Sequence, residues 1–132
     1  ALKQQLVPGL CTGELQAAFG LTEPEAGSDV RGLKTVFRRT PGGYSITGRK
    51  KFITRASTAD WFVIVGCAED EPSTFLAALV PRDAPGFTIS PDVGKLGWYG
   101  VPIASLSLCS RCMAAVGAAT SSPECGERGV PL

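Results

Sequence analysis

The sequence of 132 residues contains no histidine and no long apolar run. Without histidine there can be no Ser-His-Asp triad, no Cys-His catalytic pair and no imidazole metal ligand. The longest apolar run, Trp61 to Ala68, is much shorter than the roughly 18 residues of a membrane-spanning helix, so we expect no membrane span. Any chemistry must therefore use carboxylates, hydroxyls, backbone amides or a bound cofactor.

The cysteine content argues against a disulfide-stabilised secreted protein. The chain has five cysteines, an odd number, and its high apolar content favours a reducing compartment. Residues 1–5 lack the basic and apolar segments of a secretory signal. Cys109 and Cys112 form a C-x-x-C pair, but with Cys125 as the only later partner a zinc site would need an acidic fourth ligand. We therefore favour chemically inert thiols over a redox function for these cysteines, and we expect no bound metal.

Length and residue pattern predict a single all-β domain. A chain of this length can bury one modest core. Leu2, Leu6 and Leu10 recur at helical spacing and Pro8-Gly9 interrupts them, which indicates a short N-terminal helical segment that runs into a loop at Cys11 to Glu14. Runs of β-branched and aromatic residues between Gly and Pro turns predict strands at 33–39, 44–52, 61–67, 75–80, 87–90 and 103–108. This spacing is typical of an antiparallel β-barrel or sandwich. The Ala-, Gly- and Ser-rich residues 113–132 have no usable period, so we expect an irregular C-terminal tail.

Positive charge is concentrated in one part of the chain. Eight of the thirteen basic residues lie between Arg31 and Arg55, and no acidic residue lies among them. Such a patch attracts phosphate, whether on a nucleotide cofactor, coenzyme A or a nucleic acid. The alternative is a solvated face of the hairpin, and without other evidence that alternative is favoured.

The segment from Phe19 to Gly32 has the features of a binding loop. Pro24 and Gly27 prevent a regular element, and a turn at Gly27-Ser28 can aim successive amides at an anion. Thr22 and Ser28 add hydroxyl donors. By spacing alone an ordinary turn is favoured over an anion site. Turn geometry and surface solvation account for the three carboxylates of the segment, which are Glu23, Glu25 and Asp29.

The same segment carries a family resemblance. Gly20 to Gly32 is similar at every position to the acyl-CoA dehydrogenase signature, small-apolar-Thr-Glu-x-x-small-Gly-Ser-Asp-x-x-small. Further similar blocks follow in the expected order at 48–54, 84–87 and 95–98, so the resemblance covers about Leu6 to Leu108. It implies the end of a helical domain at residues 1–13 and a middle β-barrel domain at 14–108. Residues 109–132 form a tail without family resemblance.

The resemblance implies FAD as the cofactor and an acyl-CoA or other acyl thioester as the substrate. A base removes the α proton while the β hydride passes to flavin N5. In this family the base is a carboxylate of a C-terminal helical bundle, so no catalytic residue is assigned here and we expect this chain to be inactive alone. The resemblance further implies a homo-oligomeric full-length protein of the cytoplasm, or of the mitochondrial matrix in a eukaryote. The electron acceptor and the acyl chain length are not specified.

Seven residues match cofactor-contacting positions of the family. The first group, implied to run along the isoalloxazine ring, consists of Phe19, Leu21 and Thr22. Gly27 and Ser28 are implied to approach the FAD pyrophosphate, and Ser28 also the substrate. Phe52 and Thr54 are implied to pack on the ring and to hydrogen-bond towards N5.

Three departures from the family pattern accompany these matches. Phe52 replaces the commoner Trp, and Arg55-Ala56 stands where Asn-Gly, suited to positive φ, is usual. Tyr99 with Val101-Pro102 stands where Arg followed by Ser-Asp often occurs.

Two other hypotheses remain open. One is a basic β-domain that binds nucleic acid through the residues from Arg31 to Arg55. The nearby aromatics, Phe37, Tyr44 and Phe52, occupy strand positions that also suit a core, which disfavours base stacking. The other is a remnant that binds nothing.

Overall fold

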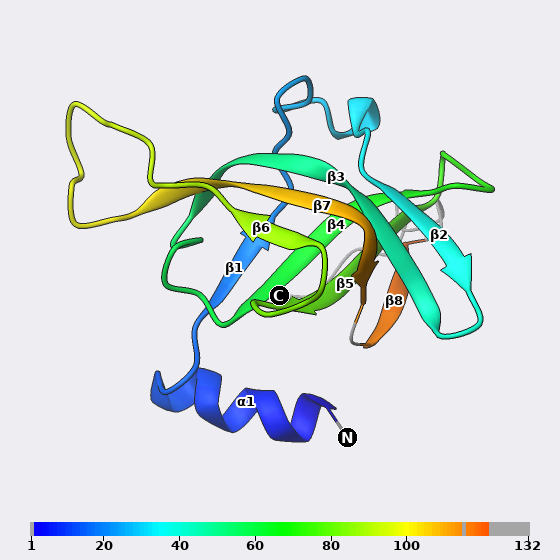
Figure 1. The fold of residues 1–132 in the computed structure, drawn as a ribbon, viewed down its shortest axis with the longest axis horizontal. Helices are drawn as coiled ribbons and strands as arrows, with labels where there is room; N and C mark the ends of the chain where they lie inside the picture. Colours follow the sequence, from blue (N-terminus) through cyan, green and yellow to red (C-terminus); the bar gives the residue numbers. More distant parts are fainter. Residues whose placement is uncertain (1, 115, 122–132) are drawn as a thin grey trace, which may run out of the picture.

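The computed structural model describes residues 2–114 and 116–121. One short helix precedes an eight-stranded sheet that curls around its core (Figure 1). Among the described residues no helix has the length and apolarity needed to cross a membrane. The elements are α1 (Leu2–Thr12), β1 (Ala17–Gly20), the short 3-10 helix η1 (Val30–Gly32), β2 (Val36–Thr40), β3 (Gly43–Thr54), β4 (Trp61–Ala68), β5 (Phe75–Pro81), β6 (Phe87–Ile89), β7 (Ile103–Met113) and β8 (Val116–Ser121).

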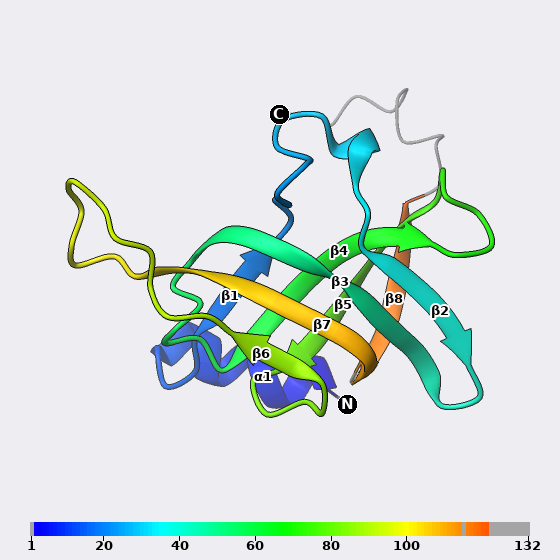
Figure 2. The ribbon, with the colours of Figure 1, turned by 45° about the horizontal axis from the view of Figure 1, so that its top comes forward.

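Two early strands pair with the same edge of β4. The strand order is β6-β7-β3-β2-β4-β5-β8, and β1 lies off this path against β4. β1 pairs in parallel with residues 61–64, whereas β2 pairs in parallel with Cys67 and Ala68. The connecting residues 21–35 therefore leave and rejoin the sheet at neighbouring points, and Figure 2 shows this connection rising above the sheet.

The core is centred on β4 and β5. Buried residues alternate with half-buried ones along most of both strands, because successive strand side chains point to opposite faces. Phe62 on β4 packs edge-to-face against Phe87 on β6, with ring centroids 4.7 Å apart. Phe37, Ile46 and Leu106 extend the same cluster into β2, β3 and β7. One continuous core thus extends from β6 to β5.

Thr35 lies where β2, β3 and β4 approach one another closely. Its carbonyl oxygen accepts a hydrogen bond from Cys67 N at 2.8 Å. A Cβ added at Gly48 would lie 2.8 Å from the Thr35 Cα, and one added at Gly66 would lie 2.5 Å from the Thr35 carbonyl oxygen. Glycine at both positions permits this close approach. The residue before β2 is therefore held firmly between two strands.

Most of the expected elements are present. The all-β class, the N-terminal helix and the hairpin of β2 and β3 are confirmed. The helix continues through Pro8 and ends at Thr12, within the loop expected at Cys11 to Glu14. The sheet is mixed rather than purely antiparallel, because β1 and β2 pair in parallel with β4. The short strand β1 was not expected from the sequence pattern.

The C-terminal part is more regular than the sequence predicts. β7 runs to Met113 instead of ending at Leu108, and Val116–Ser121 forms β8. β7 continues its pairing with β3 as far as Ser45, and β8 pairs with β5. Main-chain pairing uses backbone groups that every residue except proline has, so it does not require an apolar period. Residues 122–132 of the expected irregular tail lie outside the described residues.

Candidate functional site

Two hydrogen bonds from β3 reach carbonyl groups of the loop after β1. Lys51 N donates to the Thr22 carbonyl oxygen at 2.9 Å. Lys50 Nζ donates to the Leu21 carbonyl oxygen, also at 2.9 Å. The two sequence segments with the family resemblance, 19–32 and 48–54, therefore meet at this point of the fold.

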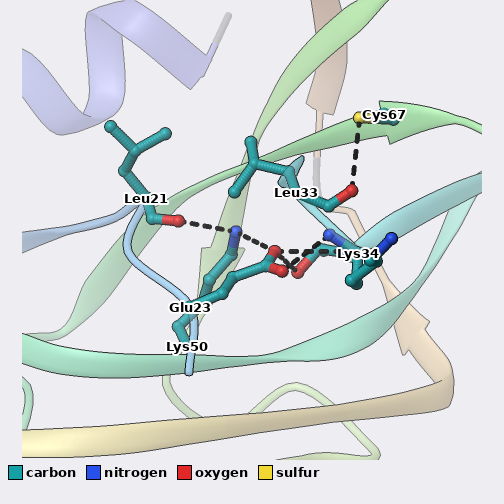
Figure 3. A network of polar contacts seen from close by, with 7 residues as sticks. Leu21, Glu23, Leu33, Lys34, Lys50 and Cys67 are labelled. Carbon is teal, nitrogen blue, oxygen red and sulfur yellow. Dashed lines mark hydrogen bonds and ion pairs between the residues drawn. The ribbon is translucent and has the colours of Figure 1, made fainter. Parts of the chain in front are cut away.

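Glu23 is the buried centre of this junction (Figure 3). Its Oε1 accepts hydrogen bonds from Lys50 Nζ at 2.8 Å and from Thr35 N at 3.0 Å and Oγ1 at 2.5 Å. Its Oε2 accepts from Lys34 N at 2.6 Å. Only 4% of Glu23 and 1% of Lys50 is exposed. The expectation that surface solvation accounts for Glu23 is wrong, because four donors in the protein interior replace water.

The surroundings of Glu23 and Lys50 shift the pKa values of both groups. Burial by itself would raise the pKa of Glu23, but hydrogen bonds from Lys50, Thr35 and the Lys34 amide outweigh burial and hold the pKa below its ordinary value. Burial lowers the pKa of Lys50, and the Glu23 carboxylate opposes that shift. An ionised carboxylate held by four donors is poorly placed to abstract a substrate proton. Glu23 is therefore a positioning residue for the loop.

The rest of the loop is arranged by local hydrogen bonds. Glu23 N donates to the Ala26 carbonyl at 2.9 Å, and Ala26 N donates back to the Glu23 carbonyl at 3.4 Å. Asp29 Oδ1 accepts from Arg31 N at 3.1 Å and so caps η1. Within the described part of the chain, no hydrogen bond uses the amides of Gly27 or Ser28. These exposed amides are free to meet an acceptor from outside.

The seven residues matched to the family lie at or near the surface. Phe19 is 58% exposed and Phe52 is 54% exposed, which is unusual for aromatic side chains of this size. Leu21 and Thr22 are half-buried, and the three remaining residues, Gly27, Ser28 and Thr54, are exposed. Exposed apolar side chains of this kind mark surfaces that contact a ligand or another protein segment.

Two of the departures from the family pattern coincide with unusual backbone. Phe52 has φ of 58° and Arg55 has φ of 60°, both in the left-handed region that disfavours side chains. Arg55 N donates to the Pro102 carbonyl at 2.7 Å, which ties the end of β3 to the segment before β7. Trp98, in the matching block 95–98, also has a left-handed φ, of 56°. The turn thus keeps the left-handed conformation expected of Asn, with Arg in its place.

The C-x-x-C pair does not form a common site. Cys109 and Cys112 lie on β7, where residues three apart point to opposite faces. Cys109 is exposed, whereas Cys112 is buried. Burial, with Cys109 nearby, raises the pKa of Cys112 to about 11, which keeps this thiol protonated and unreactive. The described residues contain no group of three or more potential Cys, Asp or Glu metal ligands, and Cys125 lies outside them.

The basic residues between Arg31 and Arg55 do not form one uncompensated patch. Lys50 is buried against Glu23, Arg38 lies 2.7 Å from Glu69, and Arg31 lies 3.1 Å from Asp29. Carboxylates that lie outside this stretch of the sequence therefore neutralise three of the eight cations. This arrangement weakens the nucleic-acid hypothesis, which relies on a continuous positive surface.

Comparison with known proteins identifies the same segment. Residues 18–110 match the family model described as acyl-CoA dehydrogenase, middle domain. The chain is 37% identical over 95 residues to a benzylmalonyl-CoA dehydrogenase of Aromatoleum aromaticum, covering 72% of this chain and 25% of that protein. It is 38% identical over 108 residues to a probable acyl-CoA dehydrogenase of Bacillus subtilis, covering 80% of this chain and 18% of that protein.

Solved structures agree with these relatives. An acyl-CoA dehydrogenase from Geobacillus kaustophilus superposes with a TM-score of 0.78 at 32% identity, covering 86% of this chain and 31% of that one. An acyl-CoA dehydrogenase from Bacillus anthracis complexed with FAD also gives 0.78, at 35% identity, covering 86% of this chain and 20% of that one. The chain thus spans less than a third of the length of these proteins. It belongs to the acyl-CoA dehydrogenase family, of which it contains the middle domain.

Proposed function

We propose that this chain forms one wall of an FAD site in an enzyme that oxidises an acyl thioester across its α and β carbons. The observation that carries the proposal is the attachment of the Thr22 segment to β3, directly before the exposed Phe52. The proposed cofactor contacts are Phe19, Leu21, Thr22, Gly27, Ser28, Phe52 and Thr54. Ser28 is also a proposed substrate contact.

The residues at this junction suit a flavin. A planar tricyclic ring needs an apolar surface beside it and hydrogen-bond donors along its polar edge. Phe19 and Phe52 provide exposed aromatic rings, while Thr22 and Thr54 provide hydroxyl groups. FAD, when bound, would accept the hydride from the substrate. Lys50 and Glu23 hold the Thr22 segment in place before any ligand arrives, so little ordering energy is lost on binding.

The proposal assigns no catalytic base to this chain. Glu23 is occupied by four hydrogen bonds, and Asp29 is bound to Arg31. Oxidation is therefore proposed for a longer protein that also contributes a base carboxylate, with acyl-CoA as the substrate class. The homo-oligomeric state and the location in the cytoplasm or mitochondrial matrix stay predictions.

Titration of the chain with FAD tests the cofactor assignment. Amide shifts followed by nuclear magnetic resonance are expected to cluster at residues 19–22, 27–28 and 52–54. Thr22→Val and Phe52→Ala should each weaken binding several-fold, since each removes a direct contact. Thr40→Val, at the last residue of β2, should leave it unchanged. Shifts confined to other parts of the sheet, or equal binding by all variants, would exclude this FAD site.

Two activity measurements test the proposed oxidation of an acyl thioester. The chain alone, supplied with FAD, an acyl-CoA and an artificial electron acceptor, should form no enoyl product. Residues 18–110, grafted into the Geobacillus kaustophilus enzyme in place of its own middle domain, should support flavin binding and oxidation. A folded chimera that retains flavin but never oxidises an acyl-CoA would argue against the proposed reaction, whereas oxidation by the chain alone would show that the base lies within it.

A further inference from the structure

An open cavity of about 370 Å³ lies on the outer face of β6, β7 and β3. It adjoins Phe52, because Nζ of the lining residue Lys51 lies 4.8 Å from the centroid of the Phe52 ring. Both ribbon views show these three strands side by side (Figure 2). We call this cavity the hydroxyl groove. Apart from the buried Lys50, its polar lining residues are Arg49, Lys51, Thr88, Ser90, Ser105 and Ser107.

The strand register explains why these side chains share one face. Arg49 on β3 pairs with Ser107 on β7, and Ser107 pairs with Thr88 on β6. Directly opposed residues of antiparallel strands point to the same side of the sheet. Their neighbours Lys50 and Leu106 also oppose each other, and both are buried. The row from Arg49 to Thr88 therefore faces outward.

The groove offers donors and positive charge without a carboxylate. Arg49 and Lys51 form no ion pair within the described part of the chain, in contrast to Arg31, Arg38 and Lys50. The hydroxyls of Thr88, Ser105 and Ser107 likewise take part in no hydrogen bond among the described residues. No acidic residue lines the cavity. Its polar groups are thus available to an anion with several oxygens.

Ser90 and Pro24 shape the groove and contribute no free donor. Ser90 Oγ accepts from Ser105 N and donates to the Pro91 carbonyl, both at 2.9 Å, so it fixes the end of β6 against β7. Pro24 forms a wall from the loop after β1. That loop is held to β3 by Lys50, so the wall is attached to the same strand as Arg49.

We propose that the hydroxyl groove binds the phosphoryl group of a small molecule. Arginine and lysine match the charge of a phosphate, and hydroxyls donate to its oxygens. No aromatic side chain lines the cavity on which a nucleic-acid base could stack, so a small phosphate ester is favoured over a polynucleotide. The lining residues include none of the seven proposed flavin contacts, but Lys51 packs over one of them, Phe52, so the groove borders the proposed flavin site.

Binding of inorganic pyrophosphate to the whole chain, measured by titration calorimetry, tests the site. Arg49→Gln and Ser107→Val should each weaken binding, the former by about tenfold, because each removes a donor to the anion. Arg39→Gln removes the same charge from an exposed position on β2 and should leave binding unchanged. Both test positions are exposed, and circular dichroism verifies that the variants remain folded. No binding at millimolar pyrophosphate, or equal weakening by all three variants, would overturn the proposal.

Competition between FAD and pyrophosphate shows which kind of molecule supplies the phosphoryl group. If FAD displaces pyrophosphate and Arg49→Gln weakens both ligands, the groove holds the pyrophosphate bridge of the dinucleotide. If both ligands bind together, the groove accepts a separate phosphate ester. Either result supports the groove. Thr22→Val discriminates this site from the flavin contacts, because it should weaken FAD without changing the affinity for pyrophosphate.

Discussion

Lys50 Nζ on β3 lies 2.8 Å from Oε1 of Glu23 in the loop after β1, and both side chains are almost fully buried. The same Nζ also donates to the Leu21 carbonyl, and Lys51 N donates to the Thr22 carbonyl. Two neighbouring residues of β3 therefore hold three consecutive positions of the loop. An ion pair removed from water recovers its solvation cost only when its geometry is good and its remaining hydrogen bonds are made. Both conditions are met here.

Removal of Lys50 should be strongly destabilising. Lys50→Met leaves the Glu23 carboxylate buried without its counter-ion, which costs about 3–5 kcal/mol. Lys51→Met, on the more accessible neighbour, should cost less than about 1 kcal/mol. Urea unfolding measures both losses of stability. The double variant Lys50→Met with Glu23→Gln should lose less stability than the sum of the losses in the two single variants. Equal stability of Lys50→Met and Lys51→Met would contradict the role of the pair.

Acid should abolish the contribution of Glu23 to stability. Its pKa in the fold is lower than the ordinary 4.5, so the unfolded chain binds the proton more readily than the folded one. The advantage of the wild type over Glu23→Gln is therefore complete above the ordinary pKa and declines as the pH falls through the folded pKa. Urea unfolding of both proteins across this range checks the sign. A difference that stays constant or grows in acid would be inconsistent with the lowered pKa.

Replacing Arg55 by a residue that tolerates its backbone conformation should stabilise the fold. A side chain in the left-handed region costs roughly 1–2 kcal/mol, and asparagine visits that region more readily. Arg55→Asn should therefore raise the free energy of unfolding by about 0.5–1 kcal/mol. Arg39→Asn, in extended backbone on β2, should lower it slightly because asparagine is disfavoured in strands. A loss of stability in Arg55→Asn would show that other contacts of Arg55 dominate.

Gly48 should not accept a methyl group. In Gly48→Ala the new Cβ would lie 2.8 Å from the Thr35 Cα, so β2 and β3 would have to move apart. Overpacking of this kind costs about 1–3 kcal/mol. Gly94→Ala, where no atom lies within 4 Å, should stay within about 0.5 kcal/mol of the wild type. Thermal unfolding compares the two, and a neutral Gly48→Ala would mean that the strands yield more easily than the packing implies.

Much of the fold follows from local pattern. The hairpin of β2 and β3 is signalled by its Pro-Gly-Gly turn, and β4 by its apolar run, because turn chemistry and strand preference act over a few residues. The pattern does not reveal β1, which has only four residues and is defined by its parallel pairing with β4. It also does not reveal β8, whose partner β5 lies far away in the sequence.

The sequence by itself determined the fold class, the family and the two segments expected to bind the cofactor, since each of these is written in short runs of residues. Only the tertiary structure decided that Glu23 is buried and ionised. Its partners Thr35 and Lys50 are 12 and 27 residues away. They meet Glu23 because β1 and β2 pair with one edge of β4 while β3 passes beneath the loop. The charge state of a buried carboxylate depends on such distant contacts, which local pattern does not contain.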